Sequence, residues 1–224
     1  MIEKKMFKKG NRKISKKVTI AATLPTTICK HNCKNCYAKV PERLFKTVRN
    51  FREFVYQETL KDTFVEKAIA EIKYHKNKVV RLHESGDFYS AEYIMKWYEI
   101  ALALPNVQFY TYTKVESVYK DEIALLNCLD NFNVINSVVK YDNGKMRGFN
   151  YGNKEYCETL QKYYDYFICP CSNPLFVGCG DTCNVCTTMD KVCFVEHTGQ
   201  NRSAFFRELG SESPHNKNKK SFFK

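Results

Sequence analysis

Two groups of cysteines constrain this chain more than any other feature of its sequence. The spacing Cys-x3-Cys-x2-Cys occurs twice, at residues 29–36 and again at residues 179–186. The chain has 11 cysteines, an odd number, and no apolar stretch suited to an export signal follows its lysine-rich start. In a reducing compartment, clustered cysteines are more often metal ligands or catalytic groups than disulfides. The sequence therefore predicts a cytoplasmic protein that binds metal through cysteine.

Strand and helix patterns alternate between the two cysteine groups. Apolar runs bounded by turn residues predict four strands, and apolar residues at helical spacing predict the helices between them. The predicted strands cover residues 18–23, 79–83, 107–112 and 134–139, and the predicted helices cover 43–60, 62–72, 90–104, 117–129 and 154–166. Asp62 and Ser90 are the expected caps of two of these helices. Regular alternation of this kind indicates an α/β fold, in which a parallel sheet is covered by helices.

The basic residues are concentrated near the two ends of the chain. Of a formal net charge of +12, residues 1–17 contribute eight lysines and arginines against one glutamate, and residues 211–224 contribute four lysines against one glutamate. Such segments attract nucleic acid through its phosphates, and they can equally be solvated termini. No apolar run is long enough to cross a bilayer, so no membrane partner is expected.

Composition and patterning together divide the chain into four parts. At 44% hydrophobic and 14% aromatic residues, the chain can build a sizeable core, which excludes global disorder. The expected parts are a basic tail at 1–17, an α/β region with the first cysteine group at 18–166, a cysteine-rich metal-binding segment at 167–200 and a basic tail at 201–224. Prolines and glycines in the third part predict irregular backbone, which a metal would stabilise.

The first cysteine group lies on the loop that follows the first predicted strand. Its sequence is Cys29-Lys-His-Asn-Cys33-Lys-Asn-Cys36-Tyr37. In a four-iron cluster, three cysteines bind three irons, and the fourth iron is available to an outside ligand. A zinc site is the alternative, with His31 or a distant cysteine as the fourth ligand, because Cys-x2-Cys pairs are common zinc units.

This motif, on a loop of a β/α array, resembles that of the radical S-adenosylmethionine superfamily, whose usual fold is a full or partial β/α barrel. The chain is also similar to a family of small phage-encoded proteins over most of residues 18–200. The segments that carry the second similarity are Cys33-x2-Cys36-Tyr-Ala, Arg81-Leu-His-Glu-Ser-Gly-Asp-Phe-Tyr-Ser90, Tyr112-Thr-Lys114 and the C-terminal cysteines. The resemblance implies a partial parallel β/α barrel, a 4Fe-4S cluster on Cys29, Cys33 and Cys36, S-adenosylmethionine as cofactor and an external electron donor.

The resemblance also implies a binding site for S-adenosylmethionine at the ends of the strands. Residues 85–87 occupy the place of the superfamily's glycine-rich motif, which contacts the methionine amino group, and polar residues after later strands would contact ribose or carboxylate. The implied residues are Ser85, Gly86, Asp87, Lys114, Asn136 and Ser137. Active sites gather at the carboxyl ends of parallel strands, which supports this placement independently. Asn35, where the superfamily usually has an aromatic residue, departs from its pattern.

The second cysteine group offers at least four ligands, so its site can be closed and therefore structural or electron-transferring. The similarity to the phage-encoded family favours Cys169, Cys179, Cys183 and Cys186, and Cys171 or Cys193 could replace one of them. Four thiolates suit zinc and a second 4Fe-4S cluster equally well. Cys128 and Cys157 fall within helical patterns, and we expect them to be buried thiols without a role.

The catalytic residues remain unassigned, and His83 is a candidate because it precedes Glu84 and Asp87 at a strand end. A structural histidine is the commoner role for such a residue. The sequence thus favours a radical S-adenosylmethionine enzyme acting on an unknown substrate, with nucleic acid or a nucleotide as the first candidate. Two alternatives remain. One is a non-enzymatic zinc protein that binds nucleic acid, and the other is an iron–sulfur redox or host-interaction factor that does not cleave S-adenosylmethionine.

Overall fold

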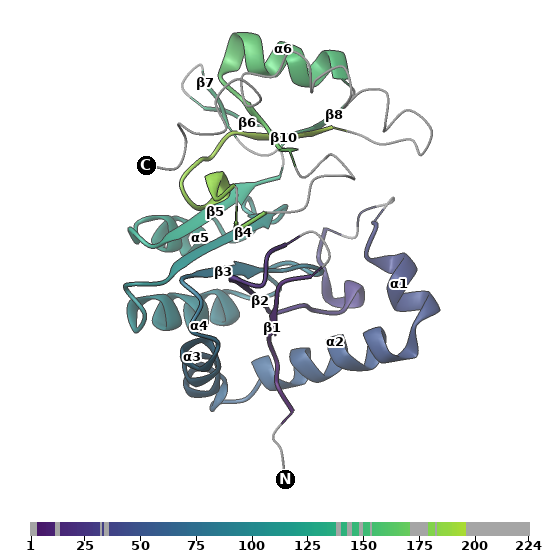
Figure 1. Ribbon diagram of the computed structural model, residues 1–224, viewed down its shortest axis with the longest axis vertical. Coiled ribbons are helices and arrows are strands. Elements are labelled where there is room, and N and C mark those ends of the chain that lie inside the picture. Colours follow the sequence, from purple (N-terminus) through teal and green to yellow (C-terminus); the bar gives the residue numbers. More distant parts are fainter. Residues whose placement is uncertain are drawn as a thin grey trace.

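A five-stranded sheet forms the centre of the computed structural model (Figure 1). The structure describes residues 4–11, 14–31, 33, 36–137, 140–142, 145–147, 150–152, 154–170, 179–181 and 183–195 of the 224-residue chain. The strands, in spatial order, are β1 (Lys8–Lys9), β2 (Val18–Ala21), β3 (Val79–Leu82), β4 (Gln108–Thr113) and β5 (Phe132–Asn136). Strands β2 to β5 are parallel, and β1 is antiparallel to β2. The α/β fold with a mostly parallel sheet is confirmed, although the described strands do not close into a barrel.

Helices cover one face of this sheet because alternate strand residues point toward them. Val80 and Leu82 of β3, and Phe109 of β4, pack in one core with Trp97 and Ile94. The helices are η1 (Thr26–Ile28), α1 (Lys39–Leu44), α2 (Lys46–Thr59), α3 (Phe64–His75), α4 (Ala91–Leu102), α5 (Lys120–Asn127), α6 (Lys154–Tyr164) and η3 (Val185–Thr187). In Figure 1, α2, α3 and α4 lie below the sheet. No described helix is both long and apolar enough to pass through a membrane.

Two helix boundaries differ from the prediction. The single helix expected over 43–60 is divided into α1 and α2 at Phe45, whose backbone is extended, with φ −117° and ψ 107°. Helix α3 begins after Thr63 rather than at Asp62. Ser90, by contrast, caps α4 as predicted, since its hydroxyl accepts a hydrogen bond from the Tyr93 amide.

A second layer lies on the other side of the sheet, above it in Figure 1. It contains a three-stranded parallel sheet, ordered β8 (Asn150–Gly152), β10 (Val192–Val195) and β9 (Phe167–Ile168), together with α6. An antiparallel pair, β6 (Lys140–Asp142) with β7 (Lys145–Arg147), precedes it. The expectation of irregular backbone from Cys169 onward is therefore wrong for β10, because this strand pairs with β8 and β9 from the preceding region.

Two cysteines outside the expected ligand groups also differ from the prediction. Cys157 of α6 is joined to Cys193 of β10 in a disulfide, so Cys157 is not an inert thiol. The pairing follows from the packing of α6 on β10, which brings together residues 36 positions apart. Cys128 is exposed rather than buried, because it is the residue at which α5 ends.

Part of the segment expected to be an N-terminal tail belongs to the folded core. Met6 and Phe7 are buried, and their backbone amides donate to the Glu71 carboxylate at 3.0 and 2.9 Å. Lys8 and Lys9 then form β1. The burial of Met6 and Phe7 could not be predicted from the sequence, because two apolar residues among many lysines show neither a strand nor a helix period.

Candidate metal centres and cofactor site

The carboxyl ends of the parallel strands are joined by reciprocal hydrogen bonds. The Leu24 amide, after β2, donates to the Ser85 carbonyl at 2.9 Å, and the buried Ser85 hydroxyl donates to the Leu24 carbonyl at 2.7 Å. Gly86, between Ser85 and Asp87, has φ +82°, and a β-carbon there would lie 2.6 Å from Leu24 Cβ. Only glycine therefore fits this position without strain.

Asp87 links the same loop to the end of β4. Its buried carboxylate accepts hydrogen bonds from the Thr113 hydroxyl and from the amides of Lys114 and Phe88, each at 2.8 Å. Burial raises the pKa of Asp87, and these three donors oppose the rise. The predicted cofactor motif, residues 85–87, thus aligns the carboxyl ends of β2, β3 and β4, while its contact with S-adenosylmethionine stays a prediction.

The other predicted cofactor residues lie at the same edge of the sheet. The Ser137 amide donates to the Thr113 carbonyl at 2.6 Å, and the Asn136 side-chain amide donates to the Glu116 carboxylate. Lys114 follows β4 directly and is partly buried. The structure therefore brings Lys114, Asn136 and Ser137 together with residues 85–87 and adds Glu116, which the sequence gave no reason to select.

Backbone strain is found at this edge. Ala22, after β2, and His83, after β3, have φ values of +51° and +58°, although neither is glycine. Such conformations cost of order 1–3 kcal/mol each, and they tend to cluster at functional sites.

The first cysteine group lies over the same edge. Its loop begins at Cys29, directly after the short helix η1. At the other end of the loop, the Tyr37 hydroxyl donates to the Glu84 carbonyl, after β3. Lys30 Nζ lies 4.9 Å from the centre of the Tyr119 ring, and His31 Nδ1 lies 3.1 Å from Cys33 Sγ. Cys29, Cys33 and Cys36 are each partly exposed, and none of them is in a disulfide.

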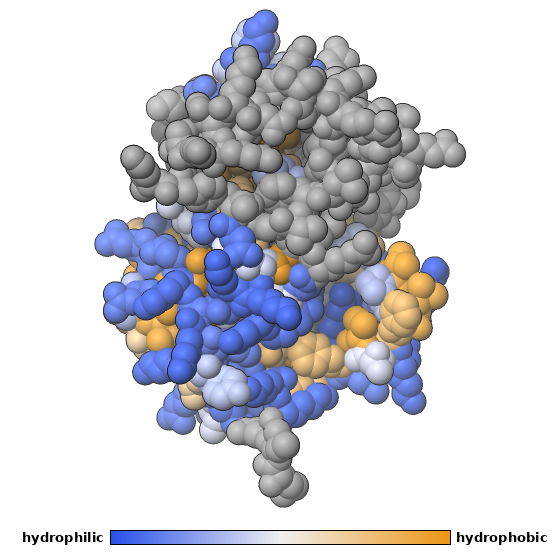
Figure 2. All heavy atoms as spheres, in the orientation of Figure 1, coloured by the Kyte–Doolittle hydropathy of each residue, from blue (hydrophilic) through white to orange (hydrophobic). Residues whose placement is uncertain are grey.

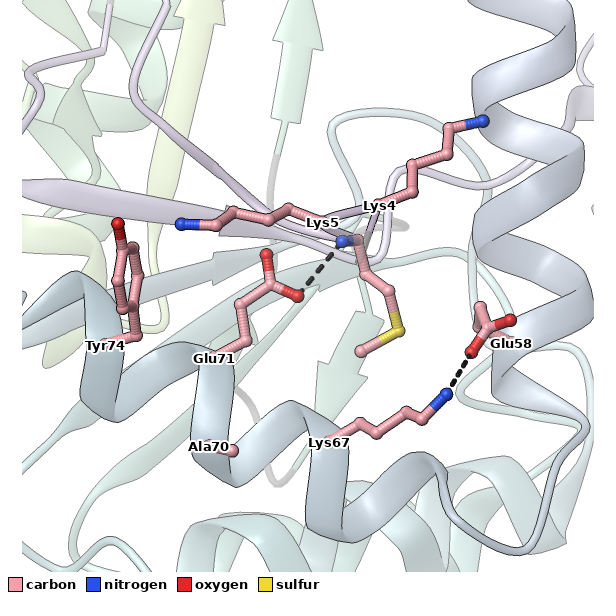
Figure 3. Close-up of a pocket in the computed structure, with 8 residues that line it drawn as sticks. Lys4, Lys5, Glu58, Lys67, Ala70, Glu71 and Tyr74 are labelled. Carbon is pink, nitrogen blue, oxygen red and sulfur yellow. Dashed lines mark hydrogen bonds and ion pairs between the residues drawn. The ribbon is translucent and has the colours of Figure 1, made fainter. Parts of the chain in front are cut away.

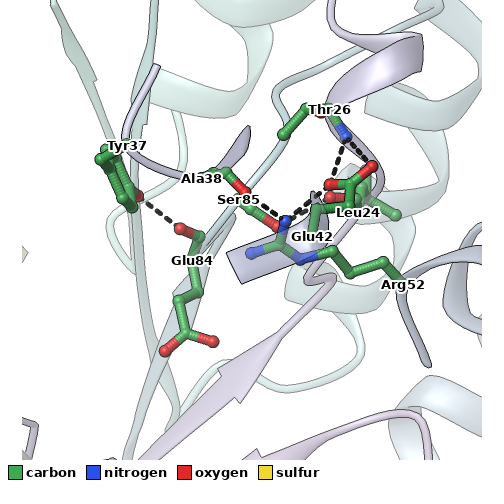
Figure 4. Close-up of polar contacts among 8 residues, drawn as sticks. All are labelled: Leu24, Thr26, Tyr37, Ala38, Glu42, Arg52, Glu84 and Ser85. Atoms are coloured by element: carbon green, nitrogen blue, oxygen red, sulfur yellow. Dashed lines mark hydrogen bonds and ion pairs between the residues drawn. The ribbon is translucent and has the colours of Figure 1, made fainter. Parts of the chain in front are cut away.

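A buried ion pair holds both ends of the cysteine loop (Figure 4). Arg52 of α2 donates to the Glu42 carboxylate at 2.6 Å and to the Ala38 carbonyl at 2.9 Å. The same carboxylate accepts the Thr26 amide at 3.0 Å. Thr26 precedes Cys29 and Ala38 follows Cys36, so the pair fixes the distance between the two ends of the loop. Neither charged residue is among those predicted from the sequence.

His83 is placed in the core rather than at an open site. Its ring is 4.8 Å from the Phe88 ring, and its nitrogens lie 3.0 Å from Thr111 Oγ1 and 3.2 Å from the Tyr93 hydroxyl. Burial lowers the pKa of His83 to about 3, so the imidazole is neutral at pH 7. These contacts are those of a structural histidine, which is the second of the two roles that the sequence leaves open for His83.

The second cysteine group packs on the sheet face opposite the helices. Arg81 of β3 and Tyr110 and Tyr112 of β4 point to this face, where the Tyr112 hydroxyl donates to Cys186 Sγ at 2.7 Å. Cys179 Sγ lies 3.9 Å from the Tyr110 hydroxyl. Alternation along β3 and β4 explains why all three residues face away from α4, and this alternation is the signal by which the sequence could have identified Arg81.

The environment of these cysteines disfavours free thiolates in the absence of a metal. Burial raises the pKa of Cys186 to about 12, and the nearby Cys179 and Cys183 add to this rise. The hydrogen bond from Tyr112 acts in the opposite direction and lowers the pKa. Burial also raises the pKa of Cys183. Cys169 packs in the same apolar cluster as Cys186 and Tyr110. Cys179 and Cys183 thus lie near enough to Cys186 to affect its pKa, and Cys169 shares an apolar cluster with Cys186. Cys193 is paired with Cys157, and Cys171 lies outside the described residues.

Within the part of the chain that the structure describes, no three cysteine, histidine or acidic side chains form a group that could hold a metal ion as they stand. Thiolate ligands commonly converge only when the metal binds, since metal binding and local folding are coupled. Both metal centres therefore remain predictions. Whether they are plausible depends on whether the cysteines present suit the expected metal or cluster.

A separate pocket lies between the N-terminal segment and helices α2 and α3 (Figure 3). It has a volume of about 240 Å³, and its lining residues are Lys4, Lys5, Met6, Glu58, Lys67, Ala70, Glu71 and Tyr74. Lys67 pairs with Glu58 at 3.2 Å, and Glu71 accepts the Met6 amide. Its carboxylates are thus committed to contacts within the protein.

The described surface also carries a group of exposed apolar side chains next to the first cysteine group. Val40, Leu44 and Phe45 on and after α1 are 51%, 62% and 55% exposed, and apolar atoms gather there at the right of Figure 2. Hydrophilic side chains cover much of the remaining described surface in that view.

Fold and cysteines together define an α/β protein with a parallel sheet and a cysteine loop over its carboxyl edge. The chain matches the Gene product 88 family, a phage gene product family, over residues 4–153, and it belongs to that family. The match includes the first cysteine group and the whole five-stranded sheet, and it ends before Cys169. Neither the curated proteins nor the solved structures contain a significant match to this chain.

Proposed function

We propose that this protein is a radical S-adenosylmethionine enzyme, in which Cys29, Cys33 and Cys36 bind three irons of a 4Fe-4S cluster and S-adenosylmethionine binds the fourth. One observation carries the proposal: the three cysteines lie on the loop after the first parallel strand, over the carboxyl ends of the neighbouring strands. In parallel α/β sheets, this edge is where active sites form.

The donor set fits such a cluster. Iron–sulfur clusters are held by cysteine thiolates, and three thiolates leave one iron open. The cysteines are partly exposed, which leaves room for an external ligand, and the Glu42–Arg52 pair fixes both ends of their loop. When bound, the reduced cluster would supply the electron that cleaves a carbon–sulfur bond of S-adenosylmethionine and so starts radical chemistry.

The residues of the chain itself would bind and orient the cofactor. The loop at Ser85–Asp87 brings its backbone to the edge of the sheet beside the cysteine loop, and the Tyr37–Glu84 contact joins the two loops. Lys114, Asn136 and Ser137 would contact the polar groups of the cofactor from the ends of β4 and β5. The sequential order of β2 to β5 is also that of a segment of a β/α barrel, which supports a partial barrel.

Substrate and partners follow from charge and chemistry. A formal net charge of +12 favours a polyanionic substrate, so a nucleic acid or a nucleotide is the first candidate. The cluster requires an electron donor protein, and its free thiolate ligands favour a reducing compartment such as the cytoplasm, where a disulfide such as Cys157–Cys193 is rare.

The test is analysis of anaerobically purified protein for iron, zinc and acid-labile sulfide, followed by electron paramagnetic resonance with and without S-adenosylmethionine. We expect about four irons that are lost when Cys29, Cys33 and Cys36 are all replaced by serine, and a spectrum that changes when S-adenosylmethionine is added. Reduced protein should then release 5′-deoxyadenosine. Cys128→Ser is the matched control, because Cys128 is exposed and outside both cysteine groups.

Two results would replace this proposal with its alternatives. Zinc without sulfide at residues 29–36 would point to a nucleic-acid-binding zinc protein, whose affinity should fall steeply with salt. An iron–sulfur cluster that neither responds to S-adenosylmethionine nor yields 5′-deoxyadenosine would point to a redox or host-interaction factor.

A further inference from the structure

The sheet face opposite the helices carries a partly buried cation, Arg81. Arg81 Cζ lies 5.6 Å from the centre of the Tyr112 ring, and its Nε is buried without a hydrogen-bond partner. Among the described residues, no carboxylate is within ion-pair distance of Arg81, and the nearby Glu84 is paired with Lys8. A guanidinium that is partly withdrawn from water in this way is stabilised when an anion lies beside it.

Sulfur atoms are among the described groups that contact this face. Besides the 2.7 Å hydrogen bond from Tyr112 to Cys186, the Tyr110 hydroxyl lies 3.9 Å from Cys179 Sγ. The sheet thus presents one cation and two hydroxyl groups to the cysteine-bearing segment.

The backbone of that segment is fastened to the sheet on two sides. The Ser15 amide donates to the Cys179 carbonyl at 2.7 Å, and Lys17 pairs with Asp181 at 2.8 Å. Across the sheet, the Asn133 side-chain amide donates to the carbonyls of Cys186 and Met189 at 2.9 and 3.0 Å. These contacts hold the cysteines against Arg81 and the tyrosines from both sides.

We propose that Cys169, Cys179, Cys183 and Cys186 form a closed metal–thiolate centre and that Arg81, Tyr110 and Tyr112 are its positioning residues. Four thiolates and one divalent cation carry a net charge of about −2. The guanidinium balances part of this charge, and the tyrosine hydroxyls donate to the thiolate sulfurs, as groups around metal ligands commonly do. The centre joins the C-terminal segment to the sheet and leaves no open position for a substrate.

The geometry favours thiolate ligation without selecting the metal. Zinc and a 4Fe-4S cluster both accept four cysteines. The proposal does not depend on the first cysteine group, and its ligands lie beyond the residues that match the family.

The first experiment measures bound metal in a background in which Cys29, Cys33 and Cys36 are replaced by serine. We expect this protein to retain either about one zinc without sulfide or about four irons with sulfide. Adding Cys186→Ser should remove that metal, whereas adding Cys128→Ser should not. If no metal remains after Cys29, Cys33 and Cys36 are replaced, or if metal survives Cys186→Ser, the proposal is overturned, whereas the proposed function of the first centre is not contradicted.

A second experiment avoids variants that fail to fold. Tyr112→Phe keeps the ring and removes only the hydroxyl, so we expect the protein to fold and bind metal but to release it to a chelator about 10-fold faster. Arg81→Met should do the same, and Arg81→Lys should restore much of the wild-type rate. Tyr163→Phe, at an exposed tyrosine of α6, is the control. Unchanged release rates in Tyr112→Phe and Arg81→Met would show that these residues do not position the metal.

Discussion

At the scale of single residues, the carboxyl edge of the sheet depends on buried polar groups that have partners. Glu42 and Arg52 are 8% and 5% exposed, and between them they hold the backbone before Cys29 and after Cys36. Removing one partner of a buried ion pair leaves an uncompensated charge, which costs far more than the net stability that the pair provides. The conformation of the cysteine loop therefore depends on Glu42 and Arg52, which lie outside the loop.

We expect Glu42→Gln to lower the free energy of unfolding by about 3–5 kcal/mol, because it leaves the Arg52 guanidinium buried without its anion. It should also reduce iron retention at Cys29, Cys33 and Cys36, since one of the two carboxylate oxygens that accept from Thr26 becomes an NH2 donor. Urea unfolding and metal analysis measure the two effects. Glu66→Gln, at an exposed glutamate of α3, should change neither, and an equally small effect of Glu42→Gln would contradict the clamp.

Residue types with distinctive chemistry could be predicted from the sequence, and residues that act through distant pairing could not. Cysteine spacing identified both groups, and the position of Ser85–Asp87 after a strand placed these residues at the correct edge. Glu42 and Arg52 gave no signal, because the break at Phe45 divides a helix that the sequence pattern shows as continuous. The sequence shows that Arg81 alternates with Val80 and Leu82 along the strand. It does not show that the segment with Cys179 and Cys186 packs on the face to which Arg81 points.

At the scale of secondary structure, the parallel strands could be predicted from their apolar runs, and β2, β3 and β4 are each also followed by a helix. The predicted strands overlap β2, β3, β4 and β5 with boundary differences of a few residues. Strands β1, β8, β9 and β10 have two to four residues each, and such short runs carry no usable period. They exist because neighbours distant in sequence supply their hydrogen bonds, which a single sequence does not reveal.

Helix α4 offers a direct test at this scale. Its cap, Ser90, accepts a hydrogen bond from the Tyr93 amide at 3.1 Å, and α4 carries the buried Trp97. We expect Ser90→Ala to lower the free energy of unfolding by about 1 kcal/mol, because an amide at the helix start loses its acceptor. Ser90→Asp should retain most of the stability. Thermal or urea unfolding measures the difference, and equal losses in both variants would contradict the capping role.

At the scale of the whole molecule, the sheet separates two environments. The face toward α4 is an apolar core that includes the neutral His83, whereas the opposite face meets the cysteine segment through Arg81, Tyr110 and Tyr112. Global unfolding exposes both faces, so groups buried in either one couple stability to pH. Many groups titrate when the wild-type protein is acidified, and a comparison with a single variant isolates one of them.

His83 should make the folded protein less stable as the pH falls below about 6.5. Burial holds its pKa at about 3 in the folded state, whereas an unfolded histidine has a pKa of about 6.5. Between these values the unfolded chain binds a proton that the folded chain excludes, so this contribution to stability is complete above about 6.5 and is lost toward acid pH. The resulting slope approaches about 1.4 kcal/mol per pH unit.

His83→Gln, compared with the wild type in urea unfolding between pH 7.5 and 5, should show a smaller loss of stability per pH unit, whatever its stability at neutral pH. Burial also lowers the pKa of His75, but Glu71 opposes that shift, so His75→Gln should change the slope less. The pH slope is informative because a lost packing contact would lower stability equally at every pH, whereas an excluded proton changes stability only where the unfolded imidazole titrates. Identical slopes for His83→Gln and the wild type would mean that the folded protein accepts a proton at His83, which its burial between Phe88 and Tyr93 argues against.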